Sequence, residues 1–372
     1  MSSTPSPNSV DAVRAALGGP SDVSGLERLA REGRLDPDAV VAVTGKTEGT
    51  EPDETTRVDA DRAIRRFLLD SGTRSAEEIA RIPMVFTSGG VGILTPHIVA
   101  YSRCEAEPVA GSPRLAIGTA RSAIMQPEWA GSSRVIDANA AAMRAAIADS
   151  GMTASEVEYL IGKAYHVPID EIDAARAAGR AIPPLDARRL FLTTSGSAGL
   201  AAAAVLDGVA APPDDDIARD LSRWSAKASF SANPWEPVGG GGPHTQVIAL
   251  GNSAQAGGRL RIAHSAVDDL LDVAALPRAL RRAGLDVGEG PLTPAQRERV
   301  VAVYVKAGPA PEPLLRGNRQ VTSNRHYGTE LKAAVAGMFA GYLQDTHIYI
   351  SGSATHQGPP GGGTLAVVVD AG

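Results

Sequence analysis

Cysteine is almost missing from this sequence, because Cys104 is the only one in 372 residues. A single thiol can form neither an intramolecular disulfide nor a cysteine-rich metal site. The segment around it, YSRCEAE, contains no motif, so we assign Cys104 no chemical role.

Long apolar runs are missing as well. No stretch approaches the roughly 18 uninterrupted apolar residues that span a bilayer. The first ten residues, MSSTPSPNSV, lack the basic segment followed by an apolar segment that marks a secretory signal. We therefore expect a soluble, cytoplasmic protein without a membrane partner.

Neither sign of charge predominates locally. The net charge is −6 at pH 7, and acidic and basic residues are interspersed. Binding to nucleic acid or to anionic lipid needs clustered lysine and arginine, so we expect no nucleic-acid partner. The seven histidines show no metal-ligand spacing, and we interpret His97, His264 and His356 as hydrogen-bonded structural residues.

One pattern occurs three times along the chain. An apolar run delivers a lysine in VVAVTGK, VEYLIGK and VVAVYVK, and a later apolar run ends in a serine beside small residues in MVFTSGG, KASFSAN and HIYISGS. The lysines are Lys46, Lys163 and Lys306, and the serines are Ser88, Ser231 and Ser351. Self-similarity over such long units predicts a repeated domain.

Strand-like and helix-like segments alternate within each repeat. In the second repeat, RLAIGTARSA and VEYLIGKAY are typical of strands and flank the helical VIDANAAAMRAAIADSG. In the third, RLRIAHSAV and VVAVYVKAG flank the helical ALPRALRRAGL. This alternation predicts an α/β fold of three homologous domains. Turn-rich segments at about 107–113 and 251–258 place these domains at 1–107, 114–250 and 259–372.

A serine beside a lysine can perform nucleophilic catalysis. The serine hydroxyl is a weak nucleophile until a base removes its proton, and a lysine becomes such a base when burial or neighbouring cations keep it neutral. Small residues after the serine let backbone N–H groups approach a developing oxyanion. The three pairs therefore favour an amidase with a Ser-Lys dyad and internal pseudo-threefold symmetry.

Three motifs carry a resemblance to a known family. They are GKTEG at 45–49, SGG followed by TPH within 88–97, and SGSATHQGPPGGG at 351–363. With them, nearly the whole chain resembles the cyanuric acid hydrolase and barbiturase family of ring-opening amidases. The resemblance implies three similar domains around a pseudo-threefold axis, with a flat cyclic imide or triazine at the centre. It also implies a homo-oligomer, commonly a homotetramer.

The resemblance assigns roles to residues. The second pair implies Ser231 as the nucleophile and Lys163 as its base. Ser229 is a rival nucleophile, but Ser231-Ala232-Asn233 aligns with Ser88-Gly89-Gly90 and Ser351-Gly352-Ser353. The implied substrate-binding residues are Lys46, Arg57, Ser88, Gly89, Ser195, Ala232, Lys306, Arg325, Ser351 and Gly352.

The chain departs from the family pattern in the second repeat. Arg57 and Arg325 stand at matching positions in the first and third repeats, whereas Ser195 takes the arginine's place in the second, and Arg188 and Arg189 lie too far upstream. The nucleophile segment also continues into a glycine-rich insertion that contains Trp235. We expect a mobile flap or an enlarged pocket there. We therefore expect a bound ring that is larger than cyanuric acid, less symmetric, or substituted in place of one carbonyl.

The family often holds a divalent cation near the third domain. The corresponding ligands here are the backbone carbonyls of Ala354, Gln357, Gly358, Pro359 and Gly362. The family's glutamate is Gly308 in this chain, so a Mg²⁺ or Ca²⁺ ion would be held weakly unless Glu312 or another residue supplied a carboxylate. We expect that no cofactor is required, with a structural ion as the alternative.

Two hypotheses about function follow. In the first, the protein opens a small cyclic imide, ureide or triazine through an acyl-enzyme on Ser231, and the three conserved pairs of the repeat support it. In the second, it acts on a different nitrogen heterocycle, forms an amide or ring in a biosynthetic pathway, or binds a ligand without turnover. Ser195, Gly308 and the insertion support the second hypothesis.

Overall fold

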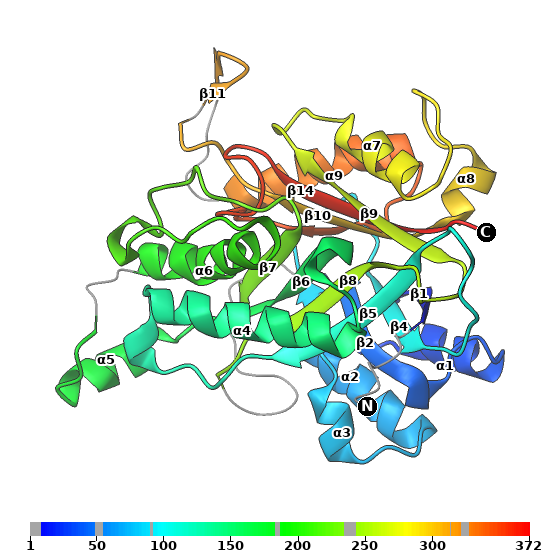
Figure 1. Cartoon of the computed structure of the whole chain (residues 1–372), viewed down its shortest axis with the longest axis horizontal. Helices are drawn as coiled ribbons and strands as arrows, with labels where there is room; N and C mark the ends of the chain where they lie inside the picture. The colour runs from blue at the N-terminus through cyan, green and yellow to red at the C-terminus, as the bar shows by residue number, and fades with distance from the viewer. Residues whose placement is uncertain are drawn as a thin grey trace.

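Three four-stranded sheets with the same strand order form the centre of the molecule (Figure 1). The computed structural model describes residues 9–48, 55–89, 92–182, 187–233, 243–312, 314–320 and 327–372. In each sheet the first strand of the segment pairs antiparallel with the last, the last pairs antiparallel with the second, and the second pairs parallel with the third.

The strands of the three sheets are listed from edge to edge. The first sheet contains β1 (Val10–Ala16), β4 (His97–Arg103), β2 (Val40–Lys46) and β3 (Met84–Thr87). The second contains β5 (Arg114–Arg121), β8 (Gln246–Ser253), β6 (Val157–Tyr165) and β7 (Ala228–Asn233). The third contains β9 (Leu260–Val267), β14 (Gly363–Asp370), β10 (Val300–Ala307) and β13 (Tyr349–Ser351). A small hairpin joins β11 (Leu314–Leu315) to β12 (Asn318–Arg319).

These sheets confirm the predicted α/β class and all the strands that carry the lysines and serines. The sequence analysis did not assign β4, β8 and β14, which lie inside each sheet. Their segments are almost continuously buried and therefore show no alternation of apolar and polar residues. The predicted boundary at residue 250 falls within β8, which continues to Ser253.

The helices lie on the outer faces of the sheets. Those of the first segment are α1 (Ser24–Arg31), α2 (Thr56–Ser71) and α3 (Ala76–Arg81); those of the second are α4 (Ser133–Ser150), α5 (Ile169–Ala177) and α6 (Ala187–Asp207); those of the third are α7 (Ala275–Arg282), α8 (Pro294–Glu298) and α9 (Tyr327–Leu343). Short 3₁₀ turns cover Pro37–Ala39, Pro127–Trp129, Ala154–Glu156 and Asp214–Asp216. In Figure 1, α1 to α3 lie below the sheets, α4 and α6 in front, and α7 to α9 above.

Glycines end several of these helices. Gly151 follows α4 in the left-handed conformation with φ 72°, which a residue without Cβ adopts at little cost. Helical spacing of apolar residues in the sequence predicts α1, α2, α4, α6, α7, α8 and α9, whereas α3 and α5 were not predicted. Both are short, and α3 begins with a capping box between Ser75 and Glu78.

Apolar side chains form one core for each sheet and a further core shared by all three. Helix-facing residues of the first, second and third sheets make separate clusters with α1–α3, with α4 and α6, and with α7 and α9. The shared cluster joins the opposite faces and includes Val99, Ile161 and Val368, one from each sheet. Each sheet is therefore covered by helices outside and by the other sheets inside.

Four fully buried tyrosines lie in the shared core, where their hydroxyls need partners. Tyr304 exchanges hydrogen bonds with Thr44, at 2.9 Å, and with Tyr101, both from the first sheet. Tyr159 of the second sheet bonds Thr364 of the third at 2.7 Å. These contacts link the sheets by directional bonds as well as by apolar packing.

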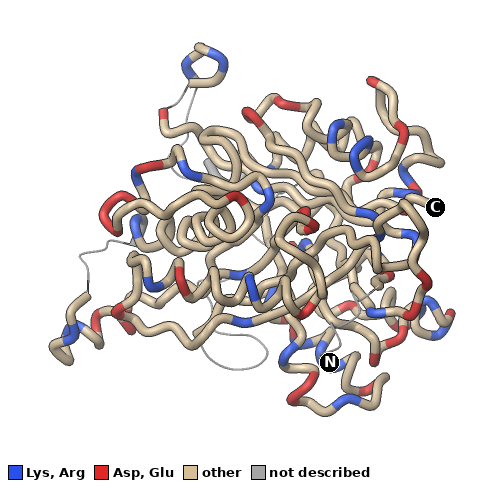
Figure 2. The backbone as a smooth tube through the Cα atoms, in the orientation of Figure 1, with Lys and Arg blue, Asp and Glu red and all other residues tan. Residues whose placement is uncertain are grey.

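Surface charge is mixed, as the sequence predicts, and Figure 2 shows acidic and basic residues interspersed over the backbone. Among the described residues, one helical stretch, Arg189–Asp207, is long and apolar enough to cross a membrane by composition. Because 67% of that window is buried inside the fold, it has the character of a core helix.

Helix α4 packs on β5 at a glycine. A Cβ at Gly118 would lie 2.0 Å from the carbonyl oxygen of Ala146 and 2.5 Å from the nitrogen of Ser150. We expect Gly118→Ala to lower the free energy of unfolding by about 1–3 kcal/mol, because backbone must move to admit the methyl group. Urea denaturation measures this change. Gly290→Ala, where nothing lies within 4 Å of the new Cβ, is the control, and equal effects of the two substitutions would contradict the packing argument.

Candidate active site

The repeated lysines lie at the ends of equivalent strands. Lys46 ends β2, while Lys163 and Lys306 lie within two residues of the ends of β6 and β10. Each strand pairs in parallel with the strand that precedes the serine motif, so the lysine and hydroxyl emerge at the same sheet edge. Side chains of paired residues point to the same face, which is why the two short segments meet although they are far apart in sequence.

The second pair is in direct contact. Lys163 pairs in register with Ser231, and Lys163 Nζ lies 2.8 Å from Ser231 Oγ. Burial lowers the pKa of Lys163 well below its ordinary value, and the positive charges of Arg57, Lys306, Lys332 and Lys46 lower it further. Burial and the neighbouring charges thus favour the neutral amine beside the hydroxyl, which is the form that accepts a proton.

Ser229 is placed differently from Ser231. It pairs in register with Ile161 and is fully buried, whereas Ser231 is partly exposed. A nucleophile must reach both its base and the substrate. The geometry therefore favours Ser231 over Ser229, as the alignment of the repeats predicts.

The third pair repeats the contact more deeply. Lys306 pairs with Ser351, and the distance from Lys306 Nζ to Ser351 Oγ is 3.0 Å. Lys306 is fully buried and Ser351 is 3% exposed. Burial lowers the pKa of Lys306 to about 7, and the positive charge of Lys332 contributes to the shift. The amine of this buried pair therefore titrates near neutral pH.

The first pair differs from the predicted alignment. Lys46 is paired in register with Thr87, one residue before Ser88. Phe86 of the first sheet thus corresponds to Phe230 of the second, and Thr87 corresponds to Ser231. The predicted equivalence of Ser88 with Ser231 and Ser351 is therefore offset by one residue. The Thr87 hydroxyl donates to the carbonyl of Ile350 at 2.9 Å, so it ties the first sheet to β13.

Small residues follow each hydroxyl as predicted. Gly89 is buried with φ 70°, Ala232 is 6% exposed, and Gly352 is half-buried.

Sequence reasoning missed Thr87, and the alignment of Phe86 with Phe230 would have found it. It also missed Lys332 of α9, whose Nζ donates to the carbonyl of Ser88 at 2.9 Å.

The predicted arginine positions are only partly described. Arg57 is the second residue of α2, and its charge acts on Lys163. Ser195 lies well inside α6 and is fully buried; within the described residues its hydroxyl has no hydrogen-bond partner. Arg325 and Trp235 fall outside the described residues.

The loop between β13 and β14 is fastened to the second sheet by hydrogen bonds. The Gln357 side chain accepts from the backbone N–H of Phe230 and donates to the carbonyl of Ser195 at 3.2 Å. His356 bonds the carbonyls of Arg223 at 2.6 Å and Ile217 at 2.5 Å. This loop therefore supports the strand that carries Ser231.

The predicted metal ligands of this loop do not fit a divalent cation well. The carbonyls of Ala354, Pro359 and Gly362 each accept a backbone hydrogen bond, from Gln357, Gly362 and Gly308 respectively. A Cβ at Gly308 would lie 2.8 Å from the nitrogen of Ala354, so the loop occupies the space of a longer side chain. Across the described ranges no group of three histidine, cysteine, aspartate or glutamate residues could hold a metal ion.

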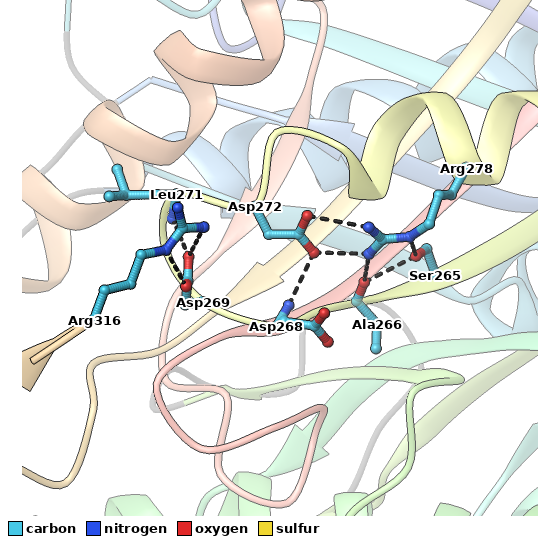
Figure 3. A network of polar contacts seen from close by, with 8 residues as sticks. All are labelled: Ser265, Ala266, Asp268, Asp269, Leu271, Asp272, Arg278 and Arg316. Carbon is cyan, nitrogen blue, oxygen red and sulfur yellow. Dashed lines mark hydrogen bonds and ion pairs between the residues drawn. The ribbon is translucent and has the colours of Figure 1, made fainter.

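Carboxylates beside the glycine-rich end of the loop are already engaged. The backbone of Asp268 packs against Gly362. In the same turn, Asp272 accepts from Arg278 at 2.7 Å and Asp269 accepts from Arg316 at 2.7 Å (Figure 3). These ion pairs shape the turn on which the loop rests.

His97, His264 and His356 are hydrogen-bonded, as the sequence analysis expects. His97 Nδ1 lies 2.8 Å from the carbonyl of Thr95, and burial lowers its pKa to about 3. His264 bonds Glu158 at 2.6 Å. His356 is engaged at both ring nitrogens in the loop described above.

Relatives in sequence define the class of protein. The chain is 31% identical over 377 residues to barbiturase 1 of Nocardioides sp., covering 98% of this chain and 100% of that protein. It is 35% identical over 374 residues to a cyanuric acid amidohydrolase of Bradyrhizobium diazoefficiens, covering 97% of this chain and 98% of that enzyme. The relatives are hydrolases of cyclic amides.

Family and fold agree with that class. The family model described as amidohydrolase ring-opening protein matches residues 11–370, and the chain belongs to this family. A solved cyanuric acid hydrolase superposes with a TM-score of 0.87 at 29% identity, covering 98% of this chain and 100% of the other. A second, from A. caulinodans, gives 0.84 at 30% identity, with coverage of 97% and 99%. The predicted family and enzyme class are confirmed.

Burying Lys306 should cost stability in a pH-dependent way. Its pKa is about 7 in the folded chain and near the ordinary 10.5 when unfolded. Between these values the unfolded chain binds more protons, so stability rises with pH from about 7 to about 10, and the cost is greatest below 7. We expect Lys306→Met to raise the free energy of unfolding by about 1–3 kcal/mol at pH 6 and by less at pH 10.

Urea denaturation at pH 6, 7, 8.5 and 10 measures this difference. Lys227→Met removes the same charge from a half-exposed position and is the control. A loss of stability in Lys306→Met that is the same at pH 6 and pH 10 would show that the bond to Ser351 outweighs the cost of burial.

Proposed function

We propose that this protein hydrolyses a C–N amide bond of a small cyclic imide, ureide or triazine of the barbiturate or cyanuric acid type. The observation that carries the proposal is the 2.8 Å contact between Ser231 and a buried lysine whose pKa is far below its ordinary value. Family membership supplies the reaction class, and this contact supplies a nucleophile with its base.

The proposed reaction uses Lys163 twice. Neutral Lys163 takes the proton of Ser231 as Oγ attacks a ring carbonyl carbon, and the ammonium then protonates the leaving ring nitrogen as the C–N bond breaks. The product is a ring-opened acyl-enzyme. Lys163 then takes a proton from water, whose oxygen attacks the ester carbon, and returns this proton to Oγ as the C–Oγ bond breaks and Ser231 is released. Protons and bonds balance without a cofactor.

In this proposal the second repeat performs the chemistry and the first and third repeats bind the substrate. Segments 1–107, 114–250 and 259–372 are three homologous domains around a pseudo-threefold axis, with the ring at the centre. The pairs Lys46/Ser88 and Lys306/Ser351 hold ring carbonyls, and Arg57 and Arg325 add charged donors. Gly89, Ala232 and Gly352 let backbone N–H groups approach the substrate, and Ser195 leaves room that an arginine would fill. Three directions of approach suit a flat ring with carbonyls on several sides.

A homotetramer in the cytoplasm is part of the same proposal. The second hypothesis, a different heterocycle or the reverse reaction, is favoured by one observation. Gly308 and Ser195 remove two charged groups of the family pattern, so the site is less symmetric than a cyanurate-binding site would be.

Loss of ultraviolet absorbance on mixing with barbituric acid or cyanuric acid tests the proposal. We expect turnover of one ring, and a decrease of kcat by about 10³-fold or more in Ser231→Ala and Lys163→Met, because both remove the activated nucleophile. Ser229→Ala is the matched control and should keep at least about a tenth of the activity. Loss in Ser229→Ala with activity retained in Ser231→Ala would assign the nucleophile to Ser229. No turnover of either ring would favour the second hypothesis.

We further propose that turnover needs no metal, because Gln357 holds the loop by protein hydrogen bonds. Treatment with EDTA should leave kcat and the melting temperature unchanged. Gln357→Leu should lower the free energy of unfolding by about 1–3 kcal/mol, since it leaves the N–H of Phe230 and the carbonyl of Ser195 without their partner. A melting temperature that falls with EDTA and recovers with Mg²⁺ or Ca²⁺ would instead show a structural ion.

A further inference from the structure

Lysine is a rare residue in this chain. Of its 36 basic residues only five are lysines, at positions 46, 163, 227, 306 and 332, and the other 31 are arginines. Three of the five are the repeated lysines of the site. Lys332 belongs to no repeat signature, yet it reaches the same region.

Lys332 joins two segments that are remote in sequence. It lies in the second turn of α9 and is half-buried, next to Leu331, which packs in the core of the third sheet. Its Nζ donates to the carbonyl of Ser88 at 2.9 Å, across 244 residues. The rigid helix of the third segment thus fixes the backbone that follows β3 in the first.

The positive charges that act on Lys163 come from the first and third segments. Arg57 of α2 and Lys46 of β2 face Lys163 from the first segment, and Lys306 of β10 and Lys332 face it from the third. For Lys306, Lys332 is the charged neighbour that lowers its pKa. Glu330, on the same helix as Lys332, is exposed. Lys332 is thus the α9 cation that acts on both dyad lysines.

We propose that Lys332 is a fourth lysine of the active site, a positioning residue that fixes the Ser88 carbonyl and adds a positive charge to the space shared by Lys163 and Lys306. Its catalytic consequence rests on the function proposed above. The charge favours the neutral form of Lys163, so the base is ready at lower pH. The hydrogen bond holds the peptide of Ser88 where a ring carbonyl would bind.

Substitutions at Lys332 separate its two actions. Lys332→Gln keeps a donor for the Ser88 carbonyl without the charge, Lys332→Met removes both, and Lys332→Arg keeps both. If Lys332 only stabilised the fold, Lys332→Gln and Lys332→Arg would give similar results in the two measurements described below. Lys227→Met removes a lysine charge that touches neither dyad and is the control.

The scarcity of lysine allows a direct measurement that does not depend on turnover. Protein grown with ¹³C-labelled lysine gives five side-chain Cε resonances, which single substitutions assign. We expect the resonance of Lys306 to titrate near pH 7 in the parent protein. Its midpoint should move up by about half a unit or more in Lys332→Met and Lys332→Gln, but not in Lys332→Arg or Lys227→Met. An unchanged midpoint in Lys332→Gln would overturn the proposal.

The pH profile of kcat/KM on the ring that is turned over tests the catalytic consequence. We expect the acidic limb to move to higher pH in Lys332→Gln and to return in Lys332→Arg, because a raised lysine pKa delays formation of the base. Only Lys332→Met should also raise KM, by about tenfold, as it frees the Ser88 peptide. If the parent protein opens neither ring, the proposed function fails while the titration still decides the role of Lys332. A pH limb that is the same in all variants would contradict the role in catalysis.

Discussion

Removing lysine ammonium groups from water is the constraint on which this structure depends. Lys46, Lys163 and Lys306 are at most 7% exposed, and burial is the largest cause of the lowered pKa values of the latter two. A single sheet covered by helices on one side could not enclose three such side chains. Three sheets that share an apolar core can, and each contributes one strand end to the enclosure. The hydroxyls of Tyr101, Tyr159 and Tyr304 are satisfied by bonds between sheets, so these three polar groups are buried in the shared core without loss of their hydrogen bonds.

The lysines stay enclosed only if the strands of the three segments keep their positions relative to one another. Hydrogen bonds between segments perform this task at the serine strands. Gln357 of the third segment accepts from the N–H of Phe230, the residue before Ser231, and Thr87 of the first segment donates to Ile350, the residue before Ser351. Strands β7 and β13 are thus each held from a neighbouring segment at the residue before the serine. Alignment within about half an ångström is what a nucleophile and its base require, and these bonds supply it from outside the pair.

The sequence predicts the repeated lysine and serine segments well, because their repetition is visible in the sequence without knowledge of how the chain folds. It predicts that Lys163 pairs with Ser231 and Lys306 with Ser351, since both pairs need only the equivalence of strands; the structure adds that the paired strands run parallel. It fails where single repeats diverge. In the first repeat Thr87, and not Ser88, pairs in register with Lys46. This shift of one residue changes which side chain faces the lysine, and motif spacing does not reveal it. Lys332 and Gln357 act across segments over 244 and 127 residues, and no local pattern marks such contacts.

Equivalent strands do not make equivalent pairs, because the second and third Lys-Ser pairs differ in their surroundings. Lys163 is surrounded by four cations from the first and third segments, whereas Lys306 is affected chiefly by burial and by Lys332. Ser231 is partly exposed, while Ser351 is buried and the carbonyl of the preceding Ile350 accepts a hydrogen bond from Thr87 of the first sheet. The second pair therefore combines a lysine with a strongly lowered pKa with the more accessible hydroxyl. A symmetric ancestor with three equal pairs would have mutually repelling ammonium groups at one centre, so unequal neutralisation is also the arrangement of lower electrostatic energy.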